Sequence, residues 1–111
     1  MKSGISKCII ETNEQTGTSY ILAESDWGKI IPIDNTSANT VLIPLNSDVP
    51  LPIGYITCIQ MAGTGVTTVG DVTGVTINKI SKGKCPMTQQ QAITLIKIGT
   101  DVWRAVGGIF V

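Results

Sequence analysis

The sequence predicts a single all-β domain, and three observations support this. Ile, Val and Thr dominate the composition, whereas Phe occurs once, and β-branched side chains suit the packed surface of a pleated sheet. The 12 Gly and 5 Pro residues fall mostly between short apolar runs, a pattern typical of many short strands joined by turns. The length of 111 residues is that of one domain with one modest core.

Turn-forming residues divide the chain into short strands. Asp34–Asn39 is rich in turn formers, and Pro50 and Pro52 enforce an extended link. Residues 81–86 are expected to form a charged loop, and residues 88–93 have room for one helical turn at most. We expect strands at 7–10, 19–23, 29–33, 40–45, 53–61, 66–69, 75–80, 94–98 and 102–106.

Two patterns of hydrophobicity occur in these strands. Val41, Ile43 and Leu45 alternate with other residues, which predicts one buried face. The runs 30–31 and 93–98 are apolar on both faces. Strands of that kind lie in the core between two sheets or at a subunit interface.

The first 18 residues are polar and irregular. We interpret residues 1–18 as an extended N-terminal arm and residues 19–111 as the β domain. Residues 1–10 contain no apolar stretch of the kind that a secretory signal needs, and no apolar run is long enough for a membrane helix. We therefore expect no membrane partner.

The composition argues against an enzyme. The chain has no His, which removes the commonest general base and metal ligand, and we expect no cofactor and no metal. Charged residues make up 14% of the chain and the net charge is zero, which argues against nucleic-acid binding through bulk charge. Cys8, Cys58 and Cys85 are widely spaced, and we interpret them as reduced, partly buried thiols, with an intersubunit disulfide or a reactive thiol as the alternatives.

Candidate ligand motifs are weak. The Gly63-Thr-Gly65 turn lacks the further residues of a dinucleotide- or phosphate-binding loop, so we interpret it as a turn. Glu24 and Asp26 could bind a hard cation with Asp34, but a solvated turn is the simpler interpretation.

The remaining candidates are a basic cluster and two tryptophans. Lys79, Lys82 and Lys84 have no aromatic residue interleaved, so a solvated loop is favoured over a nucleic-acid site. Trp27 and Trp103 are interpreted as large plugs of a core or an interface, with ligand contact as the alternative.

Three elements follow one another in a distinctive order over residues 19–108. The first is Asp-Trp-Gly-Lys-Ile-Ile at 26–31, which leads to Asp-Asn-Thr at 34–36 and Thr-Val-Leu-Ile-Pro at 40–44. The second is Leu-Pro-Ile-Gly-Tyr-Ile-Thr at 51–57, followed by the Gly- and Thr-rich run 59–69 and by Gly-Val-Thr-Ile-Asn at 74–78. The third is Thr-Leu-Ile-Lys-Ile-Gly-Thr-Asp-Val-Trp-Arg-Ala-Val-Gly-Gly at 94–108. In this order they resemble a small β module that recurs in virion proteins of tailed bacteriophages, including tail-fibre, tailspike-associated and head-decoration proteins.

The resemblance implies that residues 19–111 form a compact antiparallel β-sandwich or jelly-roll-like unit, commonly trimeric. It also implies a structural or adhesive role without catalytic activity. The chain has no long shaft or repeat, so a head decoration or cement protein that binds and stabilises the capsid fits better than a tail fibre. Its partners would be two further copies and the major capsid protein or other virion proteins. Its location would be the virion, assembled in the host cytoplasm. The interface residues expected are Lys7, Ile9 and Glu11 in the arm and Tyr55, Ile96 and Trp103 in the β unit.

Two alternatives stay open. A tail-fibre or tailspike module would attach to a host-surface glycan through loops such as 34–39, 46–52 or 81–87. A carbohydrate-binding domain outside any virus would bind sugar through Trp27 or Trp103, because exposed aromatic rings stack on sugars.

Overall fold

The computed structural model describes residues 11–88 and 91–107 and confirms the all-β prediction. Short strands account for most of the regular structure, and a single 3-10 turn is present in the described part of the chain. The elements are β1 (Ser19–Ile21), the turn η1 (Glu24–Asp26), β2 (Ile30–Ile33), β3 (Asn39–Leu42), β4 (Ile56–Met61), β5 (Thr67–Gly70), β6 (Thr76–Ile77), β7 (Ile80–Ser81), β8 (Lys84–Pro86), β9 (Ala92–Gly99) and β10 (Val102–Val106).

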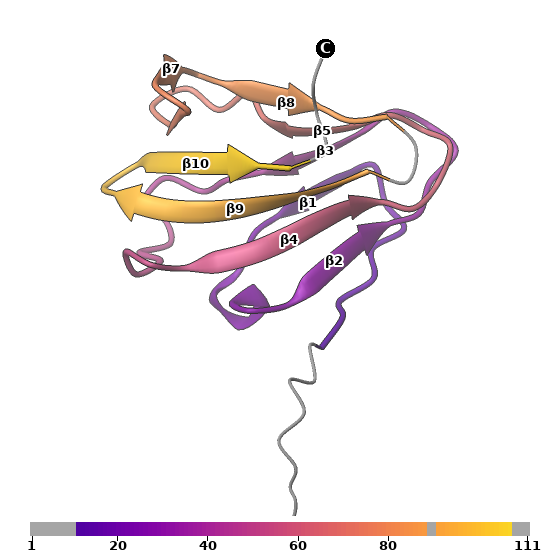
Figure 1. Ribbon diagram of the computed structural model, residues 1–111, viewed down its shortest axis with the longest axis horizontal. Coiled ribbons are helices and arrows are strands. Elements are labelled where there is room, and N and C mark those ends of the chain that lie inside the picture. The colour runs from indigo at the N-terminus through magenta and orange to yellow at the C-terminus, as the bar shows by residue number, and fades with distance from the viewer. Residues whose placement is uncertain (1–10, 89–90, 108–111) are drawn as a thin grey trace, which may run out of the picture.

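The strands form two mixed sheets. One has the order β1-β3-β5-β8 and the other the order β2-β4-β9-β10-β6-β7. The expectation of an antiparallel fold was wrong in part, because the pairs β1–β3, β3–β5, β2–β4 and β10–β6 are parallel. Figure 1 shows β2, β4, β9 and β10 side by side in the larger sheet.

The parallel pairs arise from the path of the chain. From β1 to β5 the chain changes sheet at every step, so each strand pairs with the strand two places away along the chain. Between the two strands of such a pair the chain runs back through a strand of the other sheet. It then enters the second strand in the same direction as the first, so the pair is parallel. Local turn signals do not distinguish such a corner from a hairpin, so the sequence did not reveal it.

Residues 11–15 belong to the larger sheet. Thr12 and Gln15 form parallel bridges with Ile30 and Ile33 of β2, and the N–H groups of Asn13 and Gln15 donate to carbonyl groups of β2 at 2.9 Å. The domain therefore begins before residue 19 in the described part of the chain. Residues 1–10 of the predicted arm lie outside the described residues.

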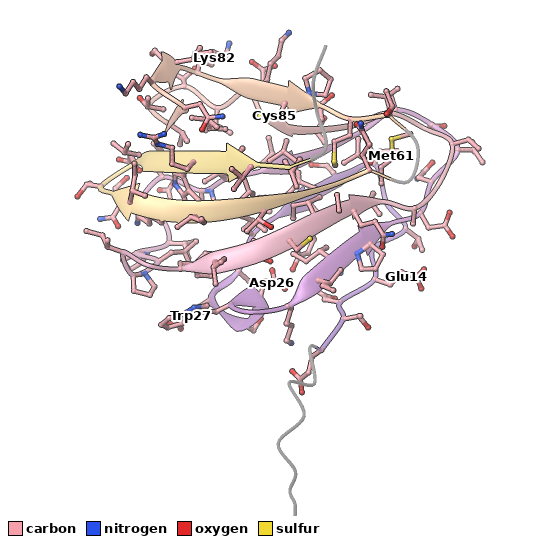
Figure 2. All side chains as sticks on the ribbon, in the orientation of Figure 1. Glu14, Asp26, Trp27, Met61, Lys82 and Cys85 are labelled. Atoms are coloured by element: carbon pink, nitrogen blue, oxygen red, sulfur yellow. The ribbon has the colours of Figure 1, made fainter. Side chains whose placement is uncertain are left out.

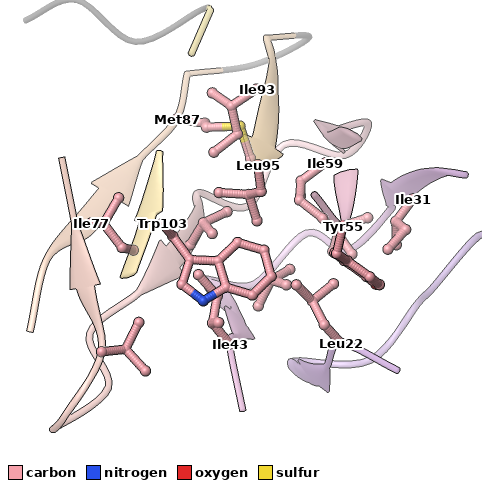
Figure 3. Close-up of a cluster of buried hydrophobic side chains, with 14 of the residues drawn as sticks. Leu22, Ile31, Ile43, Tyr55, Ile59, Ile77, Met87, Ile93, Leu95 and Trp103 are labelled. Atoms are coloured by element: carbon pink, nitrogen blue, oxygen red, sulfur yellow. The ribbon is translucent and has the colours of Figure 1, made fainter. Parts of the chain in front are cut away.

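Both sheets turn one face towards a common hydrophobic core. Val41 and Val69 come from the smaller sheet, and Ile31, Ile59 and Leu95 come from the larger one; all five are fully buried. Trp103 is the largest buried side chain and lies at the centre of this cluster (Figure 3). The predicted alternation of Val41 and Ile43 is thus confirmed, because both side chains point inward.

The second half of the chain contains two tight hairpins. β6 and β7 are joined by Asn78 and Lys79, which both have positive φ, as the preferred two-residue hairpin turn requires. The predicted strand 75–80 is therefore broken in two, and the expected loop 81–86 contains the last residue of β7 and the whole of β8. The predicted turn at 99–101 is confirmed between β9 and β10.

Residues 88–93 were predicted to have room for one helical turn at most. In the described part of this segment β9 begins at Ala92, so residues 92 and 93 lie in a strand instead. The Gly63–Gly65 stretch leads into strand β5, as predicted. A Cβ atom at Gly65 would collide with the carbonyl group of Ser37. Glycine is required there because two loops pass backbone to backbone.

Candidate functional site

The outward face of the larger sheet is the most distinctive surface of the described chain. In β4, Thr57, Ile59 and Met61 point into the core, so Ile56, Cys58 and Gln60 point outward. The same alternation in β9 turns Thr94, Ile96 and Ile98 outward. We call this surface the outer face, and it consists of Ile30, Pro32, Ile56, Cys58, Gln60, Ala92, Thr94, Ile96, Ile98, Arg104 and Val106.

The register brings the apolar members of the outer face into contact with one another. Ile56 lies opposite Ile96, and Cys58 lies opposite Thr94 on one side and Ile30 on the other. Arg104, opposite Ile96, carries the only charge among the eleven residues. Contiguous exposed apolar surface of this kind marks interaction sites.

The outward side chains of the smaller sheet are different. They include Ser19, Thr40, Thr68 and Lys84 beside the apolar residues Ile21, Leu42 and Pro86. A mixed face of this composition is common on the solvent-exposed side of a sheet. The outward faces of the two sheets thus differ in their content of apolar side chains.

A hollow of about 240 Å³ lies in the outer face between β2 and β4. Gly28 and Lys29 border it at one end, and Cys58 and Thr94 line it. Trp27 follows the 3-10 turn η1 and precedes Gly28, which lines the hollow. Its side chain is 52% exposed. Figure 2 shows Trp27 at the rim of the molecule, close to the start of β4. The prediction that Trp27 fills the core is therefore wrong, whereas its place at an interface stays a prediction.

The other predicted aromatic residues lie in the core. Tyr55 and Trp103 are 0% and 1% exposed and pack edge to face with ring centroids 5.7 Å apart. Neither offers surface to a second subunit in this fold, so their expected role at an interface is replaced by one in the core. Ile96 is half-buried on the outer face, where a second subunit can reach it.

Of the three interface residues predicted in the arm, only Glu11 lies among the described residues. Lys7 and Ile9 lie outside the described residues. Glu11 is exposed and lies 3.9 Å from the ammonium group of Lys29. An exposed ion pair of this kind contributes little to stability, but it places Glu11 at the border of the hollow that Lys29 lines.

Asp26 lies at the centre of a buried polar network. Its carboxylate accepts hydrogen bonds from the Tyr20 hydroxyl at 2.6 Å, from Asn13 Nδ2 at 2.8 Å and from the Ala23 N–H at 3.0 Å. The side chain is 0% exposed, so the solvated turn expected at Glu24 and Asp26 is wrong for Asp26. Hydrogen bonds from these three donors replace the hydrogen bonds to water that the carboxylate loses on burial.

The network also affects two tyrosines. The pKa of Tyr20 is raised to about 12. Burial is the largest cause, and the hydrogen bond to Asp26 and the negative charge of Asp26 are the next largest. Burial and the charge of Asp26 likewise raise the pKa of Tyr55, whose hydroxyl donates to the Ala23 carbonyl oxygen at 2.7 Å. Both phenols are therefore held in the protonated form well above their ordinary titration range.

These shifts predict an alkaline limit to stability. An unfolded tyrosine loses its proton near pH 10, whereas folded Tyr20 keeps it to about pH 12. The free energy of unfolding should therefore be unaffected by these groups below pH 10 and should fall between pH 10 and 12. Urea unfolding followed across this range measures the slope, and Tyr20→Phe should make it shallower. An unchanged slope in that variant would contradict the assignment to Tyr20.

Lys97 is a buried residue that the sequence analysis missed. It points inward from β9, is 3% exposed, and donates from Nζ to Asn46 Oδ1 at 2.7 Å and to the Leu51 carbonyl oxygen at 2.6 Å. Asp101 accepts from the Asn46 N–H at 2.7 Å. Lys97 and Asp101 together fix the 46–51 loop against the β9–β10 hairpin. The inward position of Lys97 in the alternation of β9 was the signal that could have revealed it.

The other candidate motifs are structural or solvated in the described chain. Burial raises the pKa values of the free thiols of Cys58 and Cys85, which makes both weak nucleophiles at neutral pH. Lys79, Lys82 and Lys84 are exposed, and Lys82 lies 3.8 Å from Asp71. No group of three or more potential metal ligands is brought together within residues 11–88 and 91–107.

Comparison with protein-family models and with curated proteins gives no match for the chain. Within the part of the chain that the structure describes, no helix is both long and apolar enough to span a membrane. The geometry of the site is therefore the main basis for a functional assignment.

Proposed function

We propose that the chain is a non-enzymatic structural subunit of a tailed-bacteriophage virion: a homotrimeric β-sandwich protein that decorates the head and stabilises the capsid. The observation that carries the proposal is the outer face, where eight of the eleven named outward residues of β2, β4, β9 and β10 are apolar and one, Arg104, is charged. The ordered resemblance of residues 19–108 to phage virion modules supports the same assignment.

The proposed mechanism is mechanical. Burial of the outer face between subunits removes apolar area from water, which favours association by about 25 cal/mol per Å². Contacts to the capsid exist only in the assembled shell. They stabilise that shell by mass action, because the subunit binds the assembled state and not the separated parts. The zero net charge leaves little overall repulsion between copies.

A charge on the outer face should prevent association. Ile96→Lys places an ammonium group opposite Arg104 at the centre of the face, and burial of an unpaired charge costs several kcal/mol. We expect self-association to weaken at least about 100-fold, measured by sedimentation equilibrium. The matched control is Thr40→Lys, on the outward side of the central strand β3 in the smaller sheet, which should leave the association constant unchanged. Equal effects of the two substitutions would contradict the assignment.

The capsid role needs a separate experiment. The purified chain should co-sediment with purified heads of a phage that encodes it, and it should raise the temperature at which those heads lose their DNA. A variant that lacks residues 1–10 tests the predicted arm, because it should remain a folded oligomer but should no longer bind heads. The deletion should end there, because Asn13 is part of the Asp26 network. Failure of the full chain to bind heads would contradict the decoration role.

A further inference from the structure

Lys97 is a buried cation without an anion beside it. Its side chain is 3% exposed, and Nζ donates to Asn46 Oδ1 at 2.7 Å and to the Leu51 carbonyl oxygen at 2.6 Å. Both acceptors are neutral, and among the described residues no carboxylate forms an ion pair with Nζ. Burial of an ammonium group is costly unless an opposite charge is paired with it. A reaction that turns this group into a neutral one removes that cost.

Two buried aromatic residues flank Lys97 in the larger sheet. Trp103 of β10 lies opposite Lys97 in the register, and on the other side the Lys97 N–H donates to the Tyr55 carbonyl oxygen at 2.9 Å. Trp103 and Tyr55 are 1% and 0% exposed. The sheet therefore holds Nζ in one position that is almost closed to water. Fixed positions of this kind accelerate a reaction between two groups of the same chain.

Asn46 places the carbonyl group of its carboxamide beside the amine. The carbon Cγ is bonded directly to the oxygen that Nζ contacts, and the last side-chain torsion of asparagine is broad. A small rotation about this torsion turns the face of the carboxamide towards Nζ, at the separation of about 3–3.5 Å from which a bond can form. A lysine amine and an asparagine carboxamide are thus held in reacting positions.

Asp101 supplies a carboxylate at the same place. Its Oδ1 accepts from the Asn46 N–H at 2.7 Å, so it contacts the residue that carries the carboxamide. Asp101 and Asn46 are both half-buried. A carboxylate in this position can take up a proton and release it again, as a general base and acid.

We propose that Lys97 and Asn46 form an intramolecular isopeptide bond, with Asp101 as the proton carrier. Asp101 takes one proton from the ammonium group, and the neutral amine forms a bond from Nζ to Asn46 Cγ. The bond between Cγ and Nδ2 breaks, and Nδ2 leaves as ammonia with a second proton from Nζ. Asp101 returns its proton to the ammonia. One ammonium group and one carboxamide become one secondary amide and one ammonium ion, so atoms and charge balance without a co-reactant.

The product fits the groups that surround it. Nζ keeps one hydrogen, which the Leu51 carbonyl oxygen accepts, and the buried positive charge is gone. The bond joins residues 51 positions apart in the sequence and ties the 46–51 loop covalently to β9. A crosslink over such a distance stabilises the fold by restricting the unfolded chain. This property goes beyond the proposed virion role and does not depend on it.

The intact mass of the full chain is the first test. The purified chain, denatured for mass spectrometry, should be lighter than its sequence by one molecule of ammonia. Lys97→Arg and Asn46→Ala should each have the mass of their sequence. The matched control is Lys84→Arg, at an exposed position of β8, which should still lose ammonia. An unmodified chain with the full mass of its sequence would overturn the proposal.

Tryptic peptides of the unmodified chain locate the bond without any variant. They are needed because Asn46 could also lose ammonia by cyclising onto the N–H of Ser47. Trypsin should not cleave after a linked Lys97, and it should release one branched peptide that joins residues 30–79 to residues 85–104. Fragmentation of this peptide should place the bond between Lys97 and Asn46. Normal cleavage after Lys97 would overturn the proposal whatever the intact mass.

Two substitutions test the proton carrier. Asp101→Asn keeps the size of the side chain and removes the carboxylate, so the linked fraction soon after synthesis should fall at least about 10-fold. Asp101→Glu keeps a carboxylate and should restore part of the reaction. Equal linked fractions in the unmodified chain and in Asp101→Asn would remove the role of Asp101 and leave the bond standing.

The outcomes are separate from those of the proposed function. A monomer that carries the bond contradicts the trimeric function and supports this proposal. A trimer whose Lys97 is cleaved normally by trypsin does the opposite.

Discussion

Replacing Trp103 by alanine is expected to lower the free energy of unfolding by about 3–5 kcal/mol. Trp103 is 1% exposed, lies at the centre of the core and packs edge to face on Tyr55. The substitution removes the largest buried side chain and leaves a cavity that the surrounding strands cannot close. Urea denaturation monitored by far-ultraviolet circular dichroism measures the loss.

Trp103→Phe is the matched control for this substitution. The indole Nε1–H of Trp103 is buried without a hydrogen-bond acceptor among the described residues. Phenylalanine keeps an aromatic ring against Tyr55 and removes that unpaired donor, whose burial is costly. We expect a loss below about 2 kcal/mol, well under that of the alanine variant. If the two variants lowered the free energy of unfolding equally, the result would contradict the view that Trp103 stabilises the core through the packing of its ring.

Replacing Asp26 by alanine is expected to be nearly as damaging. The change leaves the Tyr20 hydroxyl, the Asn13 amide and the Ala23 N–H without their acceptor. Each unsatisfied buried group costs roughly 1–3 kcal/mol, so the free energy of unfolding should fall by at least about 3 kcal/mol. The N-terminal segment should also loosen, because Asn13 connects it to the network. Amide hydrogen exchange of residues 12–15 measures this effect.

The control for Asp26 removes one donor instead of the acceptor. Tyr20→Phe leaves the carboxylate with two of its three partners, so the loss should be about 1 kcal/mol. A loss below 1 kcal/mol for Asp26→Ala, or faster exchange of residues 12–15 in Tyr20→Phe than in Asp26→Ala, would contradict the central position of the carboxylate.

Much of the local structure could be predicted from the sequence, because it depends on short-range chemistry. The strands at 29–33 and 102–106 and the turn at 99–101 follow from apolar runs bounded by turn formers. The pairing of strands did not follow, because it depends on contacts between distant residues. Ile30, for example, pairs with Cys58 across 28 positions of the sequence, and nothing in either strand specifies a parallel partner.

The burial of Asp26 and the exposure of Trp27 also depend on contacts between residues that the sequence pattern does not show. General preferences place an aspartate outside and a tryptophan inside, but the structure buries Asp26 and exposes half of Trp27. Burial of the carboxylate requires donors from Asn13, Tyr20 and Ala23 to converge, and no local pattern reveals that convergence. The outward position of Ile96 was predictable, because the run 93–98 is apolar on both faces and only one face can point into the core.

The measurement that tests the account most directly is the molar mass of the purified chain by light scattering at several concentrations. The account predicts a mass approaching three times 11.7 kDa as the concentration rises, with the outer face buried between subunits. A mass that stays at that of one chain over the whole range would contradict the assignment of the outer face as a self-association surface.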